Sequence, residues 1–99
     1  MHYYILEGTF KENHPVGPAF KEALDAHLAY LRSYFESGQV LVSGPKAAGG
    51  GGVMVIKFEN EADVEPFIAN DPFVSRGVQE YRVTKFNVFA AQPYADQWK

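Results

Sequence analysis

The chain has 99 residues, 46% of them hydrophobic and 15% aromatic, and its formal net charge at pH 7 is −3. This length predicts a single domain over residues 1–99, and nine scattered Lys and Arg residues argue against a nucleic-acid surface. No apolar run approaches the roughly 20 residues that span a bilayer, and the lack of cysteine removes disulfides and thiolate chemistry. We therefore expect a cytoplasmic protein with no membrane partner.

The N-terminal part predicts a strand, a loop and a helix. Residues 2–7 are β-branched or aromatic and end at Gly8, which indicates an interior strand that is apolar on both faces. Residues 9–18 are polar and irregular, so we predict a long loop that contributes to a pocket rim. Over residues 18–35 apolar residues recur at helical spacing, which predicts an amphipathic helix that stops at Gly38.

Two short strands are predicted next. Residues 39–43 form one, and residues 53–58 form another that pairs with it in an antiparallel hairpin. The glycine run of residues 49–52 joins them. No Lys-Ser or Lys-Thr follows these glycines and a strand comes next, so a flexible hairpin is favoured over a phosphate-binding loop.

The C-terminal part predicts a helix, a strand and a tail. Residues 61–70 are predicted as a shorter helix with Asn60 as its N-cap, and Pro66 must either kink this helix or mark a boundary. Residues 78–90 are rich in β-forming residues and predict a long fourth strand. The tail of residues 90–99 is mostly polar and is expected either to fray or to wrap around a partner subunit.

The resulting order is β-α-β-β-α-β, which is the ferredoxin-like α+β unit with both helices on one face of a four-stranded antiparallel sheet. The six tyrosines and eight phenylalanines exceed what a protein of this size easily hides. Because the strands are apolar on both sides, we expect the uncovered face to pack against the same face of a second subunit. The prediction is a homodimer with a twofold axis, a dimeric α+β barrel.

His27 is the first candidate for chemistry. It lies three residues after Leu24 and four before Leu31, so it shares the apolar stripe of the predicted helix and points inward. A buried imidazole needs hydrogen-bond partners for its nitrogens. His27 is therefore either a core histidine that bonds to a backbone carbonyl or an active-site group that pairs with an acid.

Asp71 is the best candidate for that acid. It follows the second helix and precedes Pro72, which restricts its backbone and therefore its direction. The alternative is an aspartate that only ends or caps a helix. If Asp71 binds one ring nitrogen of His27, it orients the imidazole and leaves the other nitrogen as a general base toward a small acidic substrate.

Other polar residues offer weaker signals. The three histidines, His2, His14 and His27, lack the spacing of metal ligands, so no metal site is predicted. Arg76 follows the Asp-Pro turn, where an arginine can bind a substrate anion, but a solvated arginine is the better interpretation.

Several short motifs together resemble YCII-related (YciI-like) proteins. They occur in the expected order between about Tyr3 and Phe89: His27-Leu28-Ala29-Tyr30-Leu31, Gly38, Val42-Ser43-Gly44-Pro45, the apolar third strand, and Asp71-Pro72-Phe73 with Gly77. The resemblance implies a dimeric α+β barrel, no cofactor, and a His-Asp dyad that carries over onto His27 and Asp71, oriented by Pro72. The activity known in that family is cofactor-independent dehydrochlorination of a chlorinated hydroxyhydroquinone, in which the dyad starts proton removal.

The chain also departs from that family's pattern. An arginine before the helix-one histidine and a serine before the third strand, which help to bind an oxyanion, are both missing here. Lys21 or the backbone N–H groups of residues 49–52 are possible substitutes. Glu7 stands about where the family carries an acid, although it is equally compatible with a solvated strand end, and Ser43 with Gly44 are candidate supporting or substrate contacts.

Three functions follow. The first is an enzyme without cofactor, in which His27 and Asp71 remove a proton from a phenolic, quinonoid or enolisable small molecule and promote elimination or isomerisation. The second is a non-catalytic small-molecule-binding or accessory domain, in which the two side chains only satisfy each other. The third is another dimeric α+β barrel enzyme, similar to muconolactone isomerases or haem-free monooxygenases, against which the Asp-Pro and Ser-Gly-Pro motifs argue.

Overall fold

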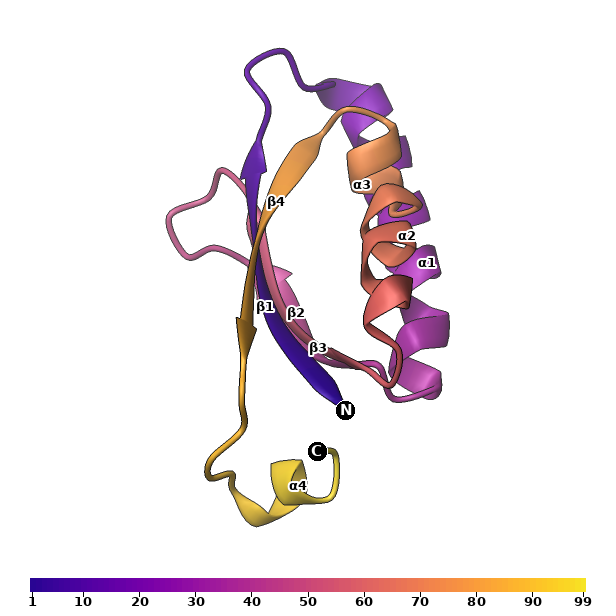
Figure 1. Ribbon diagram of the computed structural model, residues 1–99. Helices are drawn as coiled ribbons and strands as arrows, with labels where there is room; N and C mark the ends of the chain where they lie inside the picture. The colour runs from indigo at the N-terminus through magenta and orange to yellow at the C-terminus, as the bar shows by residue number, and fades with distance from the viewer.

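Segments rich in β-branched and aromatic residues form one antiparallel sheet in the computed structural model, which describes residues 1–99 (Figure 1). The strands are β1 (His2–Phe10), β2 (Val40–Pro45), β3 (Gly52–Phe58) and β4 (Gln79–Phe86). Their order across the sheet is β2-β3-β1-β4, so β1 is central, as its composition predicts. The predicted ferredoxin-like α+β fold is confirmed.

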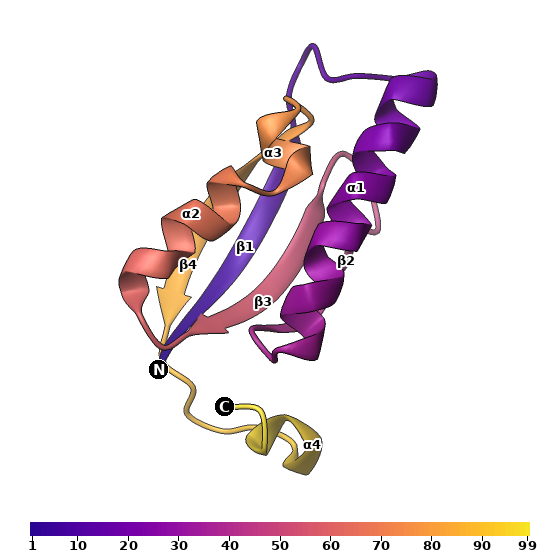
Figure 2. The same ribbon diagram turned by 90° about the vertical axis from the view of Figure 1, so that its right-hand side faces the viewer.

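Three helices, α1 to α3, lie on one face of this sheet (Figure 1). The long helix α1 (Gly17–Glu36) has a proline in its first turn, where the missing N–H costs nothing. The short elements η1 (Glu61–Asp63), α2 (Val64–Ala69) and α3 (Pro72–Ser75) form a second column. Figure 2 shows this column beside α1, in front of the sheet. The start of α1 and α3 lie near the same end of the molecule, which is where the candidate site forms.

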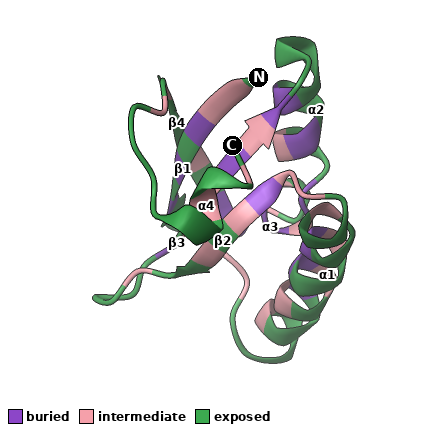
Figure 3. Cartoon of the chain, turned by 90° about the horizontal axis from the view of Figure 1, so that it is seen from below, coloured by how far each residue is buried: buried purple, intermediate pink, exposed green.

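Burial alternates along the sheet and separates its two faces. On β1, Tyr4 and Leu6 are buried under the helices, whereas Ile5 and Glu7, which alternate with them, are exposed. The open face keeps apolar side chains, because Ile5, Val42 and Val53 are 38%, 53% and 38% exposed. Figure 3 shows the buried segments concentrated between the sheet and the inner sides of the helices. One face of the sheet therefore forms the core, and the other is uncovered in the single chain.

The structure corrects the bounds of three predicted strands. The second strand runs over Val40–Pro45 rather than over residues 39–43. The fourth strand ends at Phe86 rather than at residue 90. The first strand continues to Phe10, so the loop before α1 is shorter than predicted.

The predicted helix of residues 61–70 is broken into η1 and α2. Asn60 does cap its start, because its side chain accepts a hydrogen bond from the Ala62 N–H at 3.0 Å. Pro66 is the third residue of α2, in a first turn where backbone N–H groups have no intrahelical partner. The boundary that Pro66 requires therefore lies two residues before it.

The C-terminal tail folds back onto its own chain. After the short helix α4 (Pro93–Asp96), the ring of Trp98 packs against Tyr3 with 5.8 Å between centroids. The indole N–H donates to the Gly38 carbonyl at 2.6 Å, and the Lys57 ammonium lies 4.8 Å from the Trp98 ring centroid. The tail is thus held by one aromatic anchor rather than frayed.

None of the helices combines the length and the apolar character needed to cross a bilayer.

Candidate active site

His27 and Asp71 meet between α1 and the start of α3. The Nδ1 atom of His27 lies 2.7 Å from Oδ1 of Asp71, and both side chains are buried, Asp71 completely. An ionised carboxylate can only accept, so the imidazole donates through Nδ1–H. The other nitrogen, Nε2, is left as the basic atom of the ring.

Local sequence sets the direction of Asp71. Its backbone is extended, as expected before a proline, and Pro72 begins α3. Oδ1 also accepts the Phe73 N–H at 2.9 Å, which is an N-cap hydrogen bond. The sequence left open whether Asp71 caps a helix or pairs with His27, and in the structure the same carboxylate does both.

The second carboxylate oxygen is held from the sheet. Oδ2 of Asp71 accepts the hydroxyl of Tyr81 at 2.8 Å, and that hydroxyl in turn accepts the side-chain N–H of Gln79 at 2.9 Å. Burial raises the pKa of Tyr81 well above its ordinary value, and the neighbouring charge of Asp71 and its hydrogen bond raise it further. Tyr81 therefore stays protonated and remains a donor to Asp71 throughout the neutral pH range.

Phe73 fixes the plane of the imidazole. The rings of His27 and Phe73 are stacked, with 4.2 Å between centroids and 6° between planes. Because the Phe73 N–H also binds Asp71, one residue restrains both members of the pair. The geometry is preorganised by packing as well as by hydrogen bonds.

A pocket of about 440 Å³ opens beside His27. His27 and Tyr81 are its only titratable lining groups, and no Lys or Arg takes part. The lining combines aromatic and aliphatic side chains with the glycines of the β2–β3 hairpin: Phe10, Phe20, Leu24, His27, Leu28, Ser43, Gly44, Pro45, Gly51, Gly52, Val53, Met54, Phe73, Gln79 and Tyr81. Its walls suit a small, flat, largely apolar molecule that offers few polar groups.

The structure brings some of the predicted site residues together and separates others. Ser43 and Gly44 line the pocket with His27, and Pro72 directs Asp71. Glu7 is exposed on the open face of the sheet, where it pairs with Lys46 at 2.9 Å. Lys21 is exposed and pairs with Asp25 at 2.8 Å, outside the pocket lining. Neither of these two side chains lies beside the imidazole.

The sequence analysis missed Tyr81 and Gln79. Both lie on the helix-covered face of β4, two residues apart, and Gln79 is only 1% exposed. A glutamine at an inward position of an apolar strand was the available signal, since buried polar side chains require partners. The partner, Asp71, comes from a different element and is not apparent from the strand alone.

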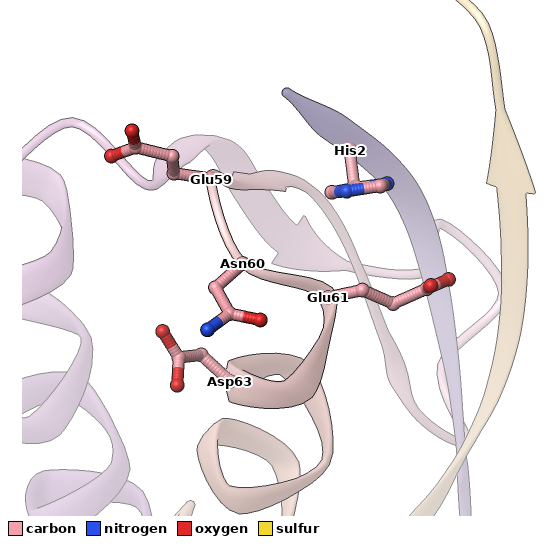
Figure 4. Close-up of a pocket in the computed structure, with 5 residues that line it drawn as sticks. All are labelled: His2, Glu59, Asn60, Glu61 and Asp63. Atoms are coloured by element: carbon pink, nitrogen blue, oxygen red, sulfur yellow. The ribbon is translucent and has the colours of Figure 1, made fainter.

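A second hollow lies at the opposite end of the sheet and has a different character. It is lined only by polar residues, namely His2, Glu59, Asn60, Glu61 and Asp63 (Figure 4). Glu61 is engaged by Lys85 at 2.7 Å, and Asn60 caps η1. No cluster of three or more His, Asp or Glu side chains has a geometry that could hold a metal ion. Capping therefore accounts for Asn60, and surface ion pairing accounts for Glu61.

Comparison with known proteins decides the family. The sequence matches the YCII-related domain over residues 1–87, which is most of the chain and includes every member of the His27 site. The chain belongs to the YCII-related family. No curated protein sequence matches it closely enough to add to this assignment.

A solved structure supports the architecture. The chain resembles 5-chloro-2-hydroxyhydroquinone dehydrochlorinase (TftG) from Burkholderia phenoliruptrix AC1100, solved in complex with 2,5-dihydroxybenzoquinone, with a TM-score of 0.67 and 20% identity. The match covers 86% of this chain and 93% of that one. At this identity the likeness establishes the shared fold.

Proposed function

We propose that this YCII-related protein is a small-molecule enzyme in which His27 acts as the general base and Asp71 orients it. The observation that carries the proposal is the His27 ring itself. Nδ1 is engaged by a fully buried carboxylate, whereas Nε2 has no hydrogen-bond partner within the chain and the ring lines the pocket. A base needs this arrangement, with one nitrogen anchored and the other directed at a substrate.

The reaction class is proton removal followed by elimination or isomerisation. Nε2 accepts a proton from a hydroxyl or an acidic C–H of the substrate, and the carboxylate of Asp71 stabilises the resulting imidazolium. In an elimination, the released electron pair forms a new double bond while a leaving anion departs from a saturated carbon of the keto form. The substrate loses one proton and one anion in total. No electrons are gained or lost, so this chemistry needs no redox cofactor.

The proposed substrates are phenolic, quinonoid or other enolisable compounds. Three phenylalanines line the pocket, and flat rings stack favourably on such walls. No Lys or Arg lines the pocket to neutralise a carboxylate or phosphate. The structural neighbour TftG is named for action on a chlorinated hydroxyhydroquinone, which belongs to the same chemical class.

The experiment is a turnover screen of halogenated hydroquinols and enolisable ring compounds. Halide release and the visible absorbance of quinonoid products are followed for the wild type and for His27→Gln. His2→Gln is the matched control, because His2 lies in the polar hollow at the other end of the sheet. We expect about a hundredfold or greater loss of kcat in His27→Gln, and unchanged kcat in His2→Gln.

The competing function is a binding domain of the same fold. Tight binding of hydroxylated ring compounds without turnover in the wild type would favour that function and overturn the catalytic proposal. Equal turnover by the wild type and a folded His27→Gln variant would remove His27 from the mechanism.

We also propose that the protein works as a homodimer. The open sheet face presents Ile5, Val42 and Val53, and a contiguous exposed apolar surface is typical of a subunit interface. Sedimentation equilibrium should give twice the chain mass of 11.1 kDa. Ile5→Asp should shift the protein toward monomer without altering the His27 pocket on the opposite face, and a wild type that sediments as a monomer would refute the dimer.

A further inference from the structure

A hydrogen-bonded chain runs from β4 to the proposed base. Gln79 donates to the Tyr81 hydroxyl, Tyr81 donates to Asp71, and Asp71 accepts from His27. The two contacts on Asp71 engage different oxygens, because Tyr81 binds Oδ2 and His27 binds Oδ1. The carboxylate is therefore fixed at both ends and cannot rotate without breaking a bond.

The direction of each bond follows from the groups involved. A carboxylate has only acceptors, so the Tyr81 hydroxyl must be the donor in its hydrogen bond with Asp71. The Tyr81 oxygen then has only lone pairs left, and Gln79 must present its N–H to it. This choice leaves the carbonyl oxygen of Gln79 buried with no hydrogen-bond partner.

An orphaned buried carbonyl is uncommon and calls for a reason. Turning the amide over would place the Gln79 oxygen beside Tyr81 and draw the tyrosine proton away from Asp71. The observed orientation instead keeps the Tyr81 O–H directed at the carboxylate. The Gln79 oxygen is thus unpaired because both hydrogen bonds, from Gln79 to Tyr81 and from Tyr81 to Asp71, are donated toward the carboxylate.

Gly8 on β1 makes room for this amide. Gly8 lies opposite Tyr81 in the sheet, and a Cβ atom at Gly8 would come within 2.3 Å of the Gln79 side-chain oxygen. Any other residue at this position would push the amide away from the tyrosine. Two strands therefore cooperate in holding the Tyr81 hydroxyl.

We infer that Tyr81 is a positioning residue for the proposed base, which keeps the negative charge on Asp71 and the proton of the neutral imidazole on His27 Nδ1. The inference rests on the proposed function for its catalytic meaning. A hydrogen bond donated to a carboxylate favours its charged form. Without it, a buried Asp71 binds a proton from solvent and donates a hydrogen bond to Nδ1. The ring's own proton then moves to Nε2, and the basic nitrogen is lost.

The test is the protonation pattern of the His27 ring, measured by 15N NMR on ligand-free protein at a pH where the ring is neutral. The wild type should show a protonated Nδ1 and an unprotonated Nε2. Tyr81→Phe should shift both signals toward the opposite tautomer. Tyr4→Phe is the matched control, because Tyr4 is also buried on the helix-covered face, and its hydroxyl contacts Glu61, outside the pocket, at 3.5 Å.

A second variant keeps the inference testable if Tyr81→Phe does not fold. Gln79→Leu leaves the tyrosine hydroxyl in place but removes its donor, so the ring signals should move in the same direction by a smaller amount. The inference is overturned if a folded Tyr81→Phe variant shows the same His27 ring signals as the control variant Tyr4→Phe. It is also overturned if only Gln79→Leu folds and its signals match the wild type.

Kinetics separate this inference from the proposed function. With a substrate found in the screen, Tyr81→Phe should lower kcat about tenfold or more, with KM within about twofold, because a charge-assisted hydrogen bond is lost and no pocket volume is added. A shift of the ring signals with no turnover of any compound would support the positioning role and reject the enzyme. Turnover of a substrate with unshifted ring signals in Tyr81→Phe would support the enzyme and reject the positioning role.

Discussion

Replacement of Asp71 by asparagine should destabilise the protein markedly, although the two side chains have nearly the same shape. Asp71 is completely buried and accepts three hydrogen bonds, from His27, Phe73 and Tyr81. In Asp71→Asn the amide oxygen can keep the first two. The amide nitrogen then replaces the oxygen that Tyr81 reaches, so the Tyr81 hydroxyl loses its acceptor.

The expected cost follows from this count. One hydrogen bond to a charged group contributes about 1.5–3 kcal/mol, and a buried N–H without a partner adds a penalty of similar order. We expect the free energy of unfolding to fall by about 2.5–6 kcal/mol in total. For a domain of this size that corresponds to a urea midpoint lower by about 2 M or more.

Urea unfolding followed by circular dichroism is the assay, and Asp25→Asn is the matched control. Asp25 is an exposed aspartate on α1 whose partner, Lys21, is also exposed, so its replacement should leave the midpoint unchanged. Equal midpoints for Asp71→Asn and Asp25→Asn would refute the view that the carboxylate holds α1, α3 and β4 together.

Three further predictions concern other parts of the molecule. Gly51→Ala should lower the free energy of unfolding by about 3 kcal/mol or more, because the φ of Gly51 is +151° and a Cβ atom there would lie 1.8 Å from the Gly8 carbonyl oxygen. Gly44→Ala is the control, since a Cβ atom at Gly44 has open space around it, and this variant should have the thermal midpoint of the wild type. Because the pKa of Tyr81 is raised in the folded chain, the folded chain keeps a proton that the unfolded chain loses above pH 10. The contribution of Tyr81 to the free energy of unfolding is therefore fully present below pH 10 and declines above it. Urea midpoints measured from pH 9 to 11 should decline less steeply in Tyr81→Phe than in the wild type, and equal slopes would contradict this. Trp98→Ala should lower stability by about 1–3 kcal/mol through loss of ring packing and of the indole hydrogen bond, and an unchanged thermal midpoint would show that the tail is not anchored.

Local sequence patterns were sufficient for the element order and for proposing His27 and Asp71 as site residues. Helical spacing placed His27 on the buried stripe of α1, and the proline after Asp71 restricted the backbone that aims its carboxylate. Both signals depend on residues within one turn of the position concerned, and such short-range preferences can be read from the chain directly. The four-stranded ferredoxin-like sheet follows from the same kind of pattern.

Interactions between distant elements decided the rest. The fourth strand stops at Phe86 although the residues beyond it favour β structure, because no neighbouring strand extends far enough to pair with them. Forty-four positions separate His27 from Asp71, and only the packing of α1 against α3 makes them a pair. Gly8 and Gln79 become related only when β1 and β4 lie side by side, which directs Tyr81 at the carboxylate. The sequence by itself therefore determined the order of the elements and the inward position of His27, whereas the tertiary structure decided which buried groups meet, since a hydrogen bond depends on distances in space that local preferences do not specify.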